Sequence, residues 1–600
     1  MKLRKIYTSA GILLLSLFCI GDAVAKDAKF ETGVSFGSTG ADEPYSSLTD
    51  KDGNYYISGM CRGDVEFAGG ATIKGRGGMD AVIVKYDAEL NFLWARAVGG
   101  SKDDTFERIA VTSAGDIVAV GKISGDITID GTDQTLSGTQ STDGCIVVYD
   151  KDGNYKSSAQ IKAAGASLCY SVAVDKSDNI FVTGSTVGAT DFGNEKTVTI
   201  EGSNPGTFLA CYNNSLVCQW AIAGSSPVQS YGWAVNFDKE ENILLTGRFG
   251  TTFTITGTDG EALTTAVGSE SSQDTYVAKL SHEGVGQWIT YVTNSNRIDT
   301  RSIDSDSQGN VYIWGHCQSA VTPEGQSPLG FNGNFDSFLI KYSSAGAYLD
   351  GMNLGGSGRD EAKSLFVDAD DNIYVAGNVN GDGSKGGTAV NMNPRGESKD
   401  YTFKGHDGYV AKYNGSTWEL MQLEKTVTPD NANRHEVAWC VTMSPDYNKV
   451  YVTGYFNNGA TVFDGASLTL PFVRDYDIYT VLYSYTLMVK TKTLEPGVAN
   501  EPYYNNIVVD NVEGAVKFEI VSGTLPDGIT LSKDGAFAGT PTKNGSYTFT
   551  VKISDDVSSI QKEYTLVIKS GEGCDVFIVT DQCPDAYIGY PYSLQLEIEG

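Results

Sequence analysis

Hydrophobic positions in this chain form short runs separated by polar turns, and one such arrangement recurs seven times. Each copy has a polar turn, a short apolar strand and a closing glycine, as in the stretch DKSDNIFVTG at Asp175–Gly184. A second apolar element follows each glycine, as in DSFLIKY at Asp336–Tyr342. The closing glycines are Gly59, Gly121, Gly184, Gly247, Gly315, Gly377 and Gly454. Repeats of roughly 60 residues made only of short strands predict a radial or stacked β architecture.

Each repeat offers four strand-like stretches, which are short, apolar or alternating, and bounded by Gly, Asp and Asn. In the second copy they are Arg108–Thr112, Asp116–Gly121, Cys145–Asp150 and Tyr155–Ile161. Four strands joined by hairpins form one blade of a propeller. Beyond Ala25, no stretch keeps apolar residues at helical spacing over three turns. The sequence therefore predicts an all-β fold, with a seven-bladed β-propeller followed by further β structure.

The phase of the repeats indicates how the ring closes. The seventh copy has its third strand at Ile478–Ser484, and the chain then changes character. The stretch Phe30–Gly37, which lies ahead of the first full repeat, has the features of the missing fourth strand. We therefore expect Phe30–Gly37 to complete the last blade and to cover the edge of the open seam.

The repeats resemble the bacterial SBBP β-propeller repeat family. Its succession of Trp, Gly-Gly, Val-Asp and Gly-Asn-hydrophobic-Tyr-Val-Thr-Gly is visible in Trp94–Gly100, Val174-Asp175 and Asn310–Gly315. The resemblance covers about residues 30 to 485. It implies the propeller fold and says little about function.

The segment Met1–Ala25 has the form of a secretory signal peptide. Lys2, Arg4 and Lys5 precede a short apolar run, and Ala23-Val24-Ala25 is a small-x-small cleavage site. Cys19 leaves lipidation as an alternative, although Phe18 stands where that processing needs a small residue. No transmembrane segment follows. We expect a protein that is secreted, or held at the outer surface of a bacterium.

A composition break near Leu487 marks a second kind of domain. The motifs Leu525–Gly528, Asp534-Gly535, Gly539–Pro541 and Gly545–Tyr547 resemble a bacterial immunoglobulin-like family that is similar to cadherin domains. The stretch from Phe577 repeats the opening of this domain. The predicted domains are a signal peptide at 1–25, the propeller at 26–486, an immunoglobulin-like β-sandwich at 487–570 and the start of a second at 571–600.

Composition narrows the possible partners. The net charge is −30 and the pI about 4.5, so the surface repels phosphate backbones and nucleic acid is excluded as a partner.

The chain after Ala25 keeps nine cysteines. Spacing allows Cys211 and Cys218 to face each other across a hairpin as a disulfide, and buried free thiols are the alternative. We expect the propeller to be monomeric.

Catalytic and metal motifs are scarce. The chain has four histidines and contains no HExxH, CxxC pair, GxSxG elbow or phosphate loop. The recurring Asp residues stand in turns and at strand starts, where a carboxylate accepts backbone N–H bonds. The turns at Asp50 and Asp368 resemble calcium-binding loops, but the other repeats lack the ligand residues at the same positions. We therefore prefer the interpretation that these Asp residues stabilise hairpin turns. No cofactor is expected. Binding of calcium at the junctions of the immunoglobulin-like domains is kept as an alternative.

Loop length suggests a binding face. The span from the closing glycine to the second element is nearly constant in five copies, but it is longer in the fourth copy, after Gly247, and longest in the sixth, after Gly377. The link into the seventh copy is also long. All three extensions emerge on one face of the ring, which is typical of a binding side, with neutral drift as the alternative. The ligand-face candidates in these loops are Asn391, Asn393, Arg395, Lys399, Tyr401, Asn431, Asn433, Arg434 and His435.

Three classes of function remain. The preferred one is a non-catalytic binding or adhesion protein, in which the propeller presents a ligand site and the immunoglobulin-like domains act as spacers. Its partner would be an extracellular polysaccharide or a surface protein, by analogy. The alternatives are a carbohydrate-active enzyme with its site on the propeller face, and a structural envelope component without a discrete ligand.

Overall fold

The computed structural model describes residues 28–266, 273–380, 388–403, 406–427, 435–457, 462–463, 466–467, 475–485, 487–489, 491, 493–512, 514–556, 558–570, 577–578 and 598–599. The predicted signal peptide, nearly all of the predicted second immunoglobulin-like domain, and Asn431, Asn433 and Arg434 lie outside these ranges. The described chain is built of strands, with one short 3-10 turn at Ala68–Gly70, which confirms the all-β prediction. Within it, no helix has the length and apolar character needed to cross a membrane.

The propeller sheets contain seven four-stranded antiparallel units, one for each sequence copy. From the inner to the outer strand, the first four units are β2 (Glu43–Thr49), β3 (Tyr55–Cys61), β6 (Asp80–Tyr86), β7 (Phe92–Gly100); β8 (Thr105–Val111), β9 (Ile117–Ile129), β10 (Thr135–Tyr149), β11 (Tyr155–Ala163); β12 (Ser167–Val174), β13 (Ile180–Thr186), β16 (Gly206–Tyr212), β17 (Cys218–Ser225); and β18 (Ser230–Phe237), β19 (Ile243–Phe249), β22 (Asp274–Leu280), β23 (Gly286–Thr293). The last three are β24 (Ile298–Ser305), β25 (Val311–Cys317), β27 (Asp336–Tyr342), β28 (Tyr348–Leu354); β29 (Glu361–Val367), β30 (Ile373–Asn380), β33 (His406–Tyr413), β34 (Leu420–Val427); and β35 (Glu436–Met443), β36 (Lys449–Phe456), β39 (Asp477–Ser484), β1 (Lys29–Phe36).

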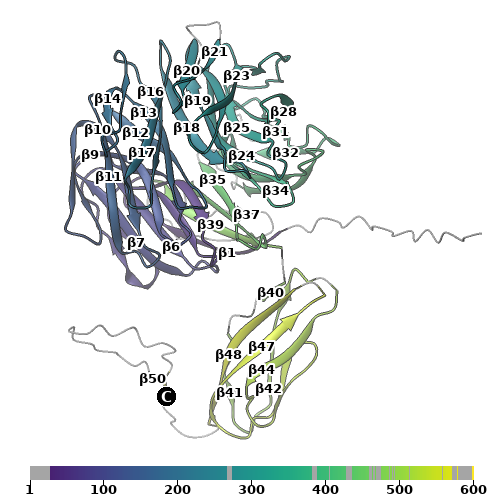
Figure 1. Ribbon diagram of the computed structural model, residues 1–600. Coiled ribbons are helices and arrows are strands. Elements are labelled where there is room, and N and C mark those ends of the chain that lie inside the picture. The colour runs from purple at the N-terminus through teal and green to yellow at the C-terminus, as the bar shows by residue number, and fades with distance from the viewer. Residues whose placement is uncertain are drawn as a thin grey trace, which may run out of the picture.

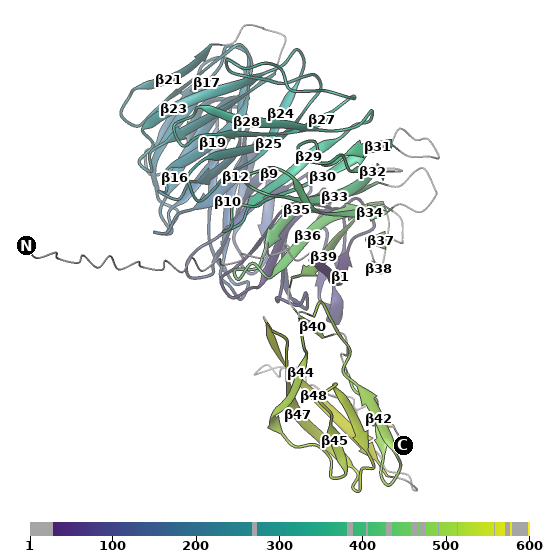
Figure 2. The same cartoon turned by 90° about the vertical axis from the view of Figure 1, so that its right-hand side faces the viewer.

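These units are arranged as a ring (Figures 1 and 2). Each innermost strand contacts the innermost strands of the two neighbouring units, and β35 contacts β2, so the circle has no gap. Between units, side chains from both sheets form a shared core, such as the cluster that joins Tyr56 and Ile83 of the first unit to Val147 of the second. The apolar face of every blade is thereby covered by the next blade.

The ring closes as the repeat phase predicts. β1 pairs with β39 along its length, from Lys29 opposite Ser484 to Phe36 opposite Ile478. Just ahead of it, the side-chain amide of Gln422 in β34 accepts a hydrogen bond from the N–H of Ala28 and donates one to its carbonyl, at 3.0 and 2.7 Å. Strands from opposite ends of the propeller therefore share one blade, which leaves no unpaired edge at the seam.

The links from the second to the third strand of each blade fold as hairpins along the outside of the ring. The hairpin β20–β21 (Thr252–Thr256 and Ala262–Ala266) adds two strands to β17 of the preceding blade. In the same way β14–β15 (Gly188–Asp191 and Thr197–Ile200) pairs with β11, and β26 (Thr322–Pro323) with β23. These links thus cover the outer strand of the preceding blade.

A second module lies apart from the ring (Figures 1 and 2). One sheet has the order β41 (Gly497–Val498), β48 (Ser559–Lys569), β47 (Gly545–Ser554), β44 (Lys517–Gly523). The other has the order β42 (Tyr503–Asn506), β46 (Ala536–Gly539), β45 (Ile529–Leu531), while β40 (Met488–Val489) pairs with β43 (Val509–Asp510). Phe537, Phe549 and Tyr564 pack between the sheets, as expected for an immunoglobulin-like sandwich.

The cysteines of the propeller are free. Cys61, Cys145, Cys169, Cys211, Cys218, Cys317 and Cys440 are all buried thiols. The disulfide considered between Cys211 and Cys218 is wrong, because a register shift places Cys218 opposite Tyr212 and Cys211 opposite Trp220. As a result Cys218 packs into the core shared with the preceding blade, and Cys211 into the core shared with the next one.

Candidate functional site

Each innermost strand carries a β-bulge near its start, at the same place in every blade. The ladder to the second strand skips one residue there, for instance between Gly232 and Ala234. A bulge re-aims the side chain of the extra residue, and here the bulged residues are directed to the ring axis. The seven bulged residues are Tyr45, Glu107, Tyr170, Trp233, Arg301, Lys363 and Trp439.

The closing glycine of each repeat makes room for this bulge. A Cβ on Gly247 would lie 1.8 Å from the carbonyl oxygen of Tyr231, just ahead of the bulged Trp233, and would clash with it. The same overlap occurs between Gly121 and the carbonyl of Thr105. The glycine that defines the repeat in the sequence is thus required by the backbone geometry that builds the axial ring.

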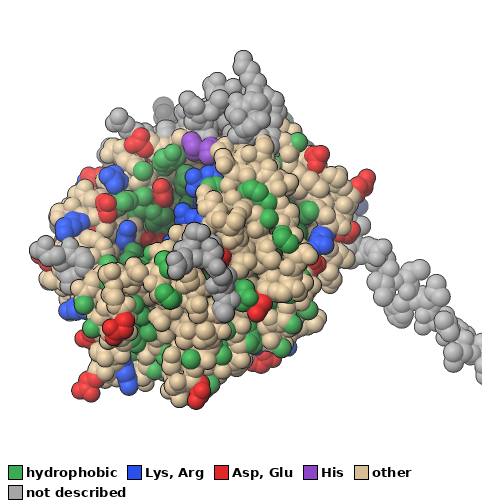
Figure 3. Space-filling model, turned by 90° about the horizontal axis from the view of Figure 1, so that it is seen from above, with side chains coloured by type: hydrophobic (Ala, Val, Ile, Leu, Met, Phe, Trp, Pro, Cys, Tyr) green, Lys and Arg blue, Asp and Glu red, His purple; other side chains and the backbone are tan. Residues whose placement is uncertain are grey.

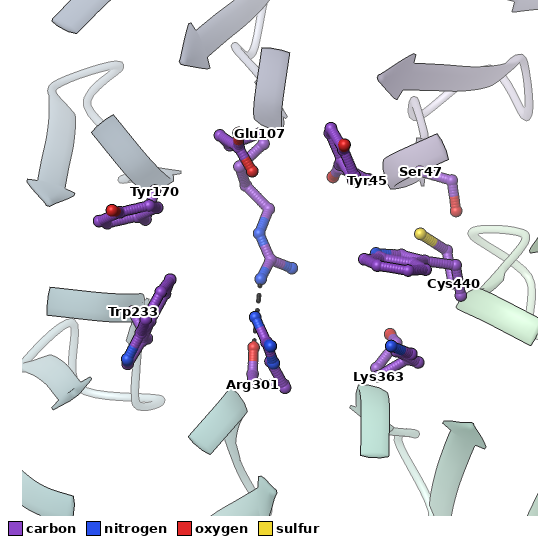
Figure 4. Close-up of a pocket in the computed structure, with 12 residues that line it drawn as sticks. Tyr45, Ser47, Glu107, Tyr170, Trp233, Arg301, Lys363 and Cys440 are labelled. Carbon is purple, nitrogen blue, oxygen red and sulfur yellow. Dashed lines mark hydrogen bonds between the residues drawn. The ribbon is translucent and has the colours of Figure 1, made fainter. Parts of the chain in front are cut away.

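The bulged side chains line a pocket on the ring axis, named here the axial pocket. Its volume is about 80 Å³, and a cavity of about 310 Å³ continues beneath it along the inner strands. Figure 4 shows side chains from all around the ring pointing inward, and Figure 3 shows the hollow at the centre of this face, with hydrophobic, basic and acidic side chains inside it. The lining residues are the seven bulged residues together with Ser46, Ser47, Arg108, Ser364 and Cys440.

Aromatic side chains form two opposed walls of the axial pocket. Tyr170 and Trp233 are neighbours on one side, with ring centroids 4.4 Å apart. Tyr45 and Trp439 are neighbours on the other, at 5.5 Å. Each of these four side chains is partly exposed in a strand whose flanking residues are largely buried. Partly exposed aromatic faces around a cavity offer a stacking surface for a ligand.

Basic side chains fill the positions between the walls. The guanidinium of Arg301 lies 5.3 Å from the ring of Trp233, and the ammonium of Lys363 lies 4.1 Å from the ring of Trp439. Arg108, beside the bulged Glu107, donates a hydrogen bond from Nη2 to the carbonyl of Arg301 at 3.3 Å, which a dashed line marks in Figure 4. The axial pocket therefore combines cations with aromatic faces.

Acidic residues above the axial pocket are already engaged by basic partners. Asp299 accepts from Arg248 at 3.0 Å and lies 2.7 Å from Arg297. Burial alone would raise the pKa of Asp299, but the His316 ring 3.6 Å away and the charges of Arg301 and Arg248 hold it well below its usual range. Asp299 thus remains a carboxylate that stabilises the rim.

The same holds on the next blade. Glu361 accepts from Lys363 at 2.8 Å and from Arg359 at 2.6 Å. Against the effect of burial, the charges of Lys363 and His316 keep the pKa of Glu361 low. By contrast, burial raises the pKa of Glu107, which accepts a hydrogen bond from the Thr105 hydroxyl at 2.8 Å. Glu107 is the one carboxylate among the lining residues.

His435, one of the predicted ligand-face residues, lies at the start of β35. Its ring stacks on that of His406 with centroids 4.0 Å apart, and it contacts Tyr476 edge to face. Histidine side chains are visible at the edge of the hollow in Figure 3. Burial lowers the pKa of both rings, that of His406 to about 4, so both are neutral at pH 7.

The other described candidates lie in the hairpin β31–β32 (Thr388–Asn391 and Asp400–Phe403), away from the axis. Asn391 accepts from the backbone of Asn393 and Lys399 and so shapes the hairpin tip. Asn393 accepts from the N–H of Leu420 at 2.8 Å, at the start of the outer strand β34. Arg395 pairs with Asp350 of β28.

The structure therefore brings these residues together at the outside of the fifth and sixth blades. Asn391, Asn393 and Arg395 hold the hairpin against the outer strands there. Lys399 is exposed, and Tyr401 packs partly against the core of the sixth blade. None of the five lines the axial pocket.

The turn carboxylates act as expected for hairpins. Asp50 accepts from the N–H groups of Asp52 and Asn54 at 3.0 and 2.9 Å, and from the Asn54 side chain at 2.8 Å. Asp306 and Asp368 make the same three bonds in their own turns. Across the described ranges, no group of three or more His, Cys, Asp or Glu residues is placed to hold a metal ion.

Sequence reasoning missed the axial ring, although a signal for it exists. The bulged residue stands at one fixed distance ahead of the closing glycine, as Glu107 does before Gly121, and one position further ahead in the seventh copy, whose turn is longer. These positions carry Tyr, Glu, Tyr, Trp, Arg, Lys and Trp, while the surrounding repeat changes little. Variation at one fixed position of a regular scaffold marks a place where the repeats are free to differ in chemistry.

Comparison with family models matches both families expected from the sequence. Residues 158–193 match the family described as "Beta-propeller repeat", and residues 480–569 match the family described as "Putative Ig domain". The first lies in the second and third blades, and the second covers the sandwich module. The resemblances stated for both parts of the chain are thereby confirmed.

Individual relatives are distant. An uncharacterized WD repeat-containing protein of Acanthamoeba polyphaga mimivirus is 21% identical over 435 residues, which is 59% of this chain and 31% of that protein. The periplasmic gluconolactonase of Pseudomonas aeruginosa is 10% identical over 70% of this chain and 98% of its own, with a TM-score of 0.34. Cadherin domains 3–6 of protocadherin gamma B2 are 11% identical over 56% of this chain and 89% of theirs, with a TM-score of 0.13. The chain thus spans about a third of the length of the viral relative.

Proposed function

We propose that this protein is a non-catalytic binding protein of the cell exterior, and that its ligand is held in the axial pocket. The observation that carries the proposal is the ring of seven equivalently placed side chains that converge on one cavity and differ from blade to blade. A concave site with aromatic faces and a few converging polar groups is the usual form of a ligand site. A propeller repeat joined to an immunoglobulin-like module is also an architecture of the extracellular binding type.

The carboxylates of the site favour binding over hydrolysis. A glycosidase uses two carboxyl groups on either side of the scissile bond. Glu107 lines the axial pocket, but Asp299 and Glu361 above it are held by arginine and lysine partners. The arrangement suits recognition of a polar ligand more than acid–base attack on one.

Binding would be tested by screening the purified propeller and sandwich on a glycan array and on whole cells. Trp233→Ala removes one of the two aromatic side chains that form one wall of the axial pocket, and Tyr504→Ala, in the sandwich module with a side chain 71% exposed, is the matched control. We expect Trp233→Ala to abolish the binding found with the wild type and Tyr504→Ala to keep it. Equal binding by all three proteins would refute the axial site.

The proposal that the protein lies outside the cytoplasm rests on the predicted signal peptide, Met1–Ala25. Expression in a bacterial host with the segment Met1–Ala25 present should deliver the protein outside the inner membrane, and removal of this segment should retain it in the cytoplasm. Protease added to intact cells distinguishes surface display from a periplasmic location.

A further inference from the structure

We infer that the axial pocket recognises an acidic sugar, with the oxyanion held by Arg108 and Arg301 and the sugar ring stacked on a neighbouring aromatic wall. This inference rests on the proposed function and names the ligand class of that same site. The oxyanion is a carboxylate or a sulfate, since both offer oxygens that a guanidinium can bind with two N–H groups.

Two guanidiniums in the pocket make no direct ion pair, although the charge of Arg301 acts on Asp299 and the charges of both act on Glu107. Arg108 and Arg301 make no ion pair with any carboxylate in the part of the chain that the structure describes. Their Nε atoms are buried and have no hydrogen-bond partner there. A desolvated charge is costly unless it is paired, so two adjacent unpaired guanidiniums indicate that an anion completes the site.

The surroundings show that this lack of pairing is local. The chain has 74 acidic and 44 basic residues. Around the rim, Arg248 and Arg297 share Asp299, and Arg359 shares Glu361 with Lys363. An acidic protein that pairs these cations, including Lys363 of the pocket, and leaves Arg108 and Arg301 without an ion pair has a local excess of positive charge at these two residues.

The aromatic neighbour of Arg301 supplies the second half of the site. The indole of Trp233 lies against the Arg301 guanidinium, and its Nε1 is buried without a hydrogen-bond partner among the described residues. The indole stacks on Tyr231 and contacts Tyr170, and the part of it that stays exposed in the pocket offers an apolar surface to one side of a pyranose ring. A cation and a partly exposed aromatic side chain thus lie within one small volume, as recognition of a charged sugar requires.

The test is titration calorimetry of the full chain with three probes: a galacturonic acid trimer, the neutral galactose trimer, and a galactose trimer that carries sulfate. We expect at least one acidic probe to bind, with the neutral probe weaker by about tenfold or more. Arg301→Gln should remove this preference, while Lys151→Gln, an exposed outer-turn cation paired with Asp152, should keep it. Preference for one acidic probe identifies the oxyanion as carboxylate or as sulfate.

The outcomes separate this inference from the proposed function. If neutral and acidic probes bind equally and Arg301→Gln changes nothing, but Trp233→Ala abolishes binding, the pocket binds sugars and the inferred charge selectivity is wrong. If no acidic probe binds, the inference is overturned. Should a glycan found by array screening bind Trp233→Ala as well as wild type, the proposed function fails too. Circular dichroism of each variant checks that the ring remains folded.

Discussion

The carbonyl oxygen of Tyr231 lies only 1.8 Å from the position that a Cβ of residue 247 would take, and residue 247 is a glycine. This contact joins the inner strand of the fourth blade to its neighbour at the start of the bulge that directs Trp233 into the axial pocket. The repeat glycine and the ligand site are therefore two consequences of one backbone feature.

Substitution of this glycine should damage both stability and the pocket. Gly247→Ala places a methyl group against backbone, which cannot move aside as a side chain can, so we expect a loss of about 3 kcal/mol in the free energy of unfolding. Gly330→Ala is the control, because a Cβ there meets open space. Urea denaturation followed by circular dichroism measures both; equal unfolding midpoints would show that the bulge does not depend on the glycine.

The N-terminal strand should be needed for a closed, monomeric ring. A chain that starts at residue 39 lacks β1 and exposes the backbone groups of β39 that pair with it. We expect a lower melting temperature and association through the open edge, in comparison with a chain that starts at residue 26. Differential scanning calorimetry and light scattering report the two effects. A monomer with an unchanged melting curve would contradict the closure.

Stability should increase on mild acidification. Burial raises the pKa of Asp104 and of Asp360 to about 7. Each carboxylate also accepts hydrogen bonds from backbone N–H groups, which lower its pKa by less than burial raises it. Because these values exceed those of the unfolded chain, the native state binds more protons between about pH 4 and pH 7, and the free energy of unfolding rises as pH falls from about 7.5 to about 5.

Below about pH 4 the trend should reverse. Asp299 and Glu361 have pKa values held low in the native state, and the stability they contribute is lost as they are protonated. Urea midpoints at constant ionic strength should therefore pass through a maximum on the acidic side of neutrality. Asp104→Asn should reduce the change in the urea midpoint between pH 5 and about 7.5. A wild-type midpoint that rises steadily up to pH 8 would contradict the raised pKa values of Asp104 and Asp360.

The buried cysteines should be unreactive in the folded protein. Burial raises the pKa of Cys218 to about 11 and that of Cys211 to about 12, so the reactive thiolate is scarce at pH 8. A thiol reagent should modify the seven propeller cysteines slowly in the native state and rapidly in denaturant. Peptide mapping that finds a bond between Cys211 and Cys218 would disprove the free-thiol assignment.

The sequence was sufficient to predict the architecture, because the information is local and repeated. Strand lengths, turn residues and the phase of the seventh copy lead directly to blades and to the pairing of Phe30–Gly37 with the last blade. The same reasoning assigned the turn carboxylate of Asp50 to backbone hydrogen bonds, which the structure confirms.

The site could not be predicted in the same way, because it depends on contacts between distant residues. Loop length shows where the chain is extended, but not that Arg395 pairs with Asp350 of the preceding blade and holds the extension against the outside of the ring. The axial residues are single positions in seven separate strands, and only closure of the ring brings Arg108 next to Arg301. The closing glycine accompanies the bulge, but the sequence alone does not show that the residue at a fixed distance ahead of it is directed inward.

The most direct test of the central claim is a crystal structure of the protein with a glycan that it binds. Our account predicts that the ligand lies in the axial pocket, with its anionic group on Arg301 and a sugar ring against Trp233 or Trp439. A ligand bound instead to the hairpin at 388–403, with the axial pocket filled only by water, would contradict the account and support the extended loops as the binding site.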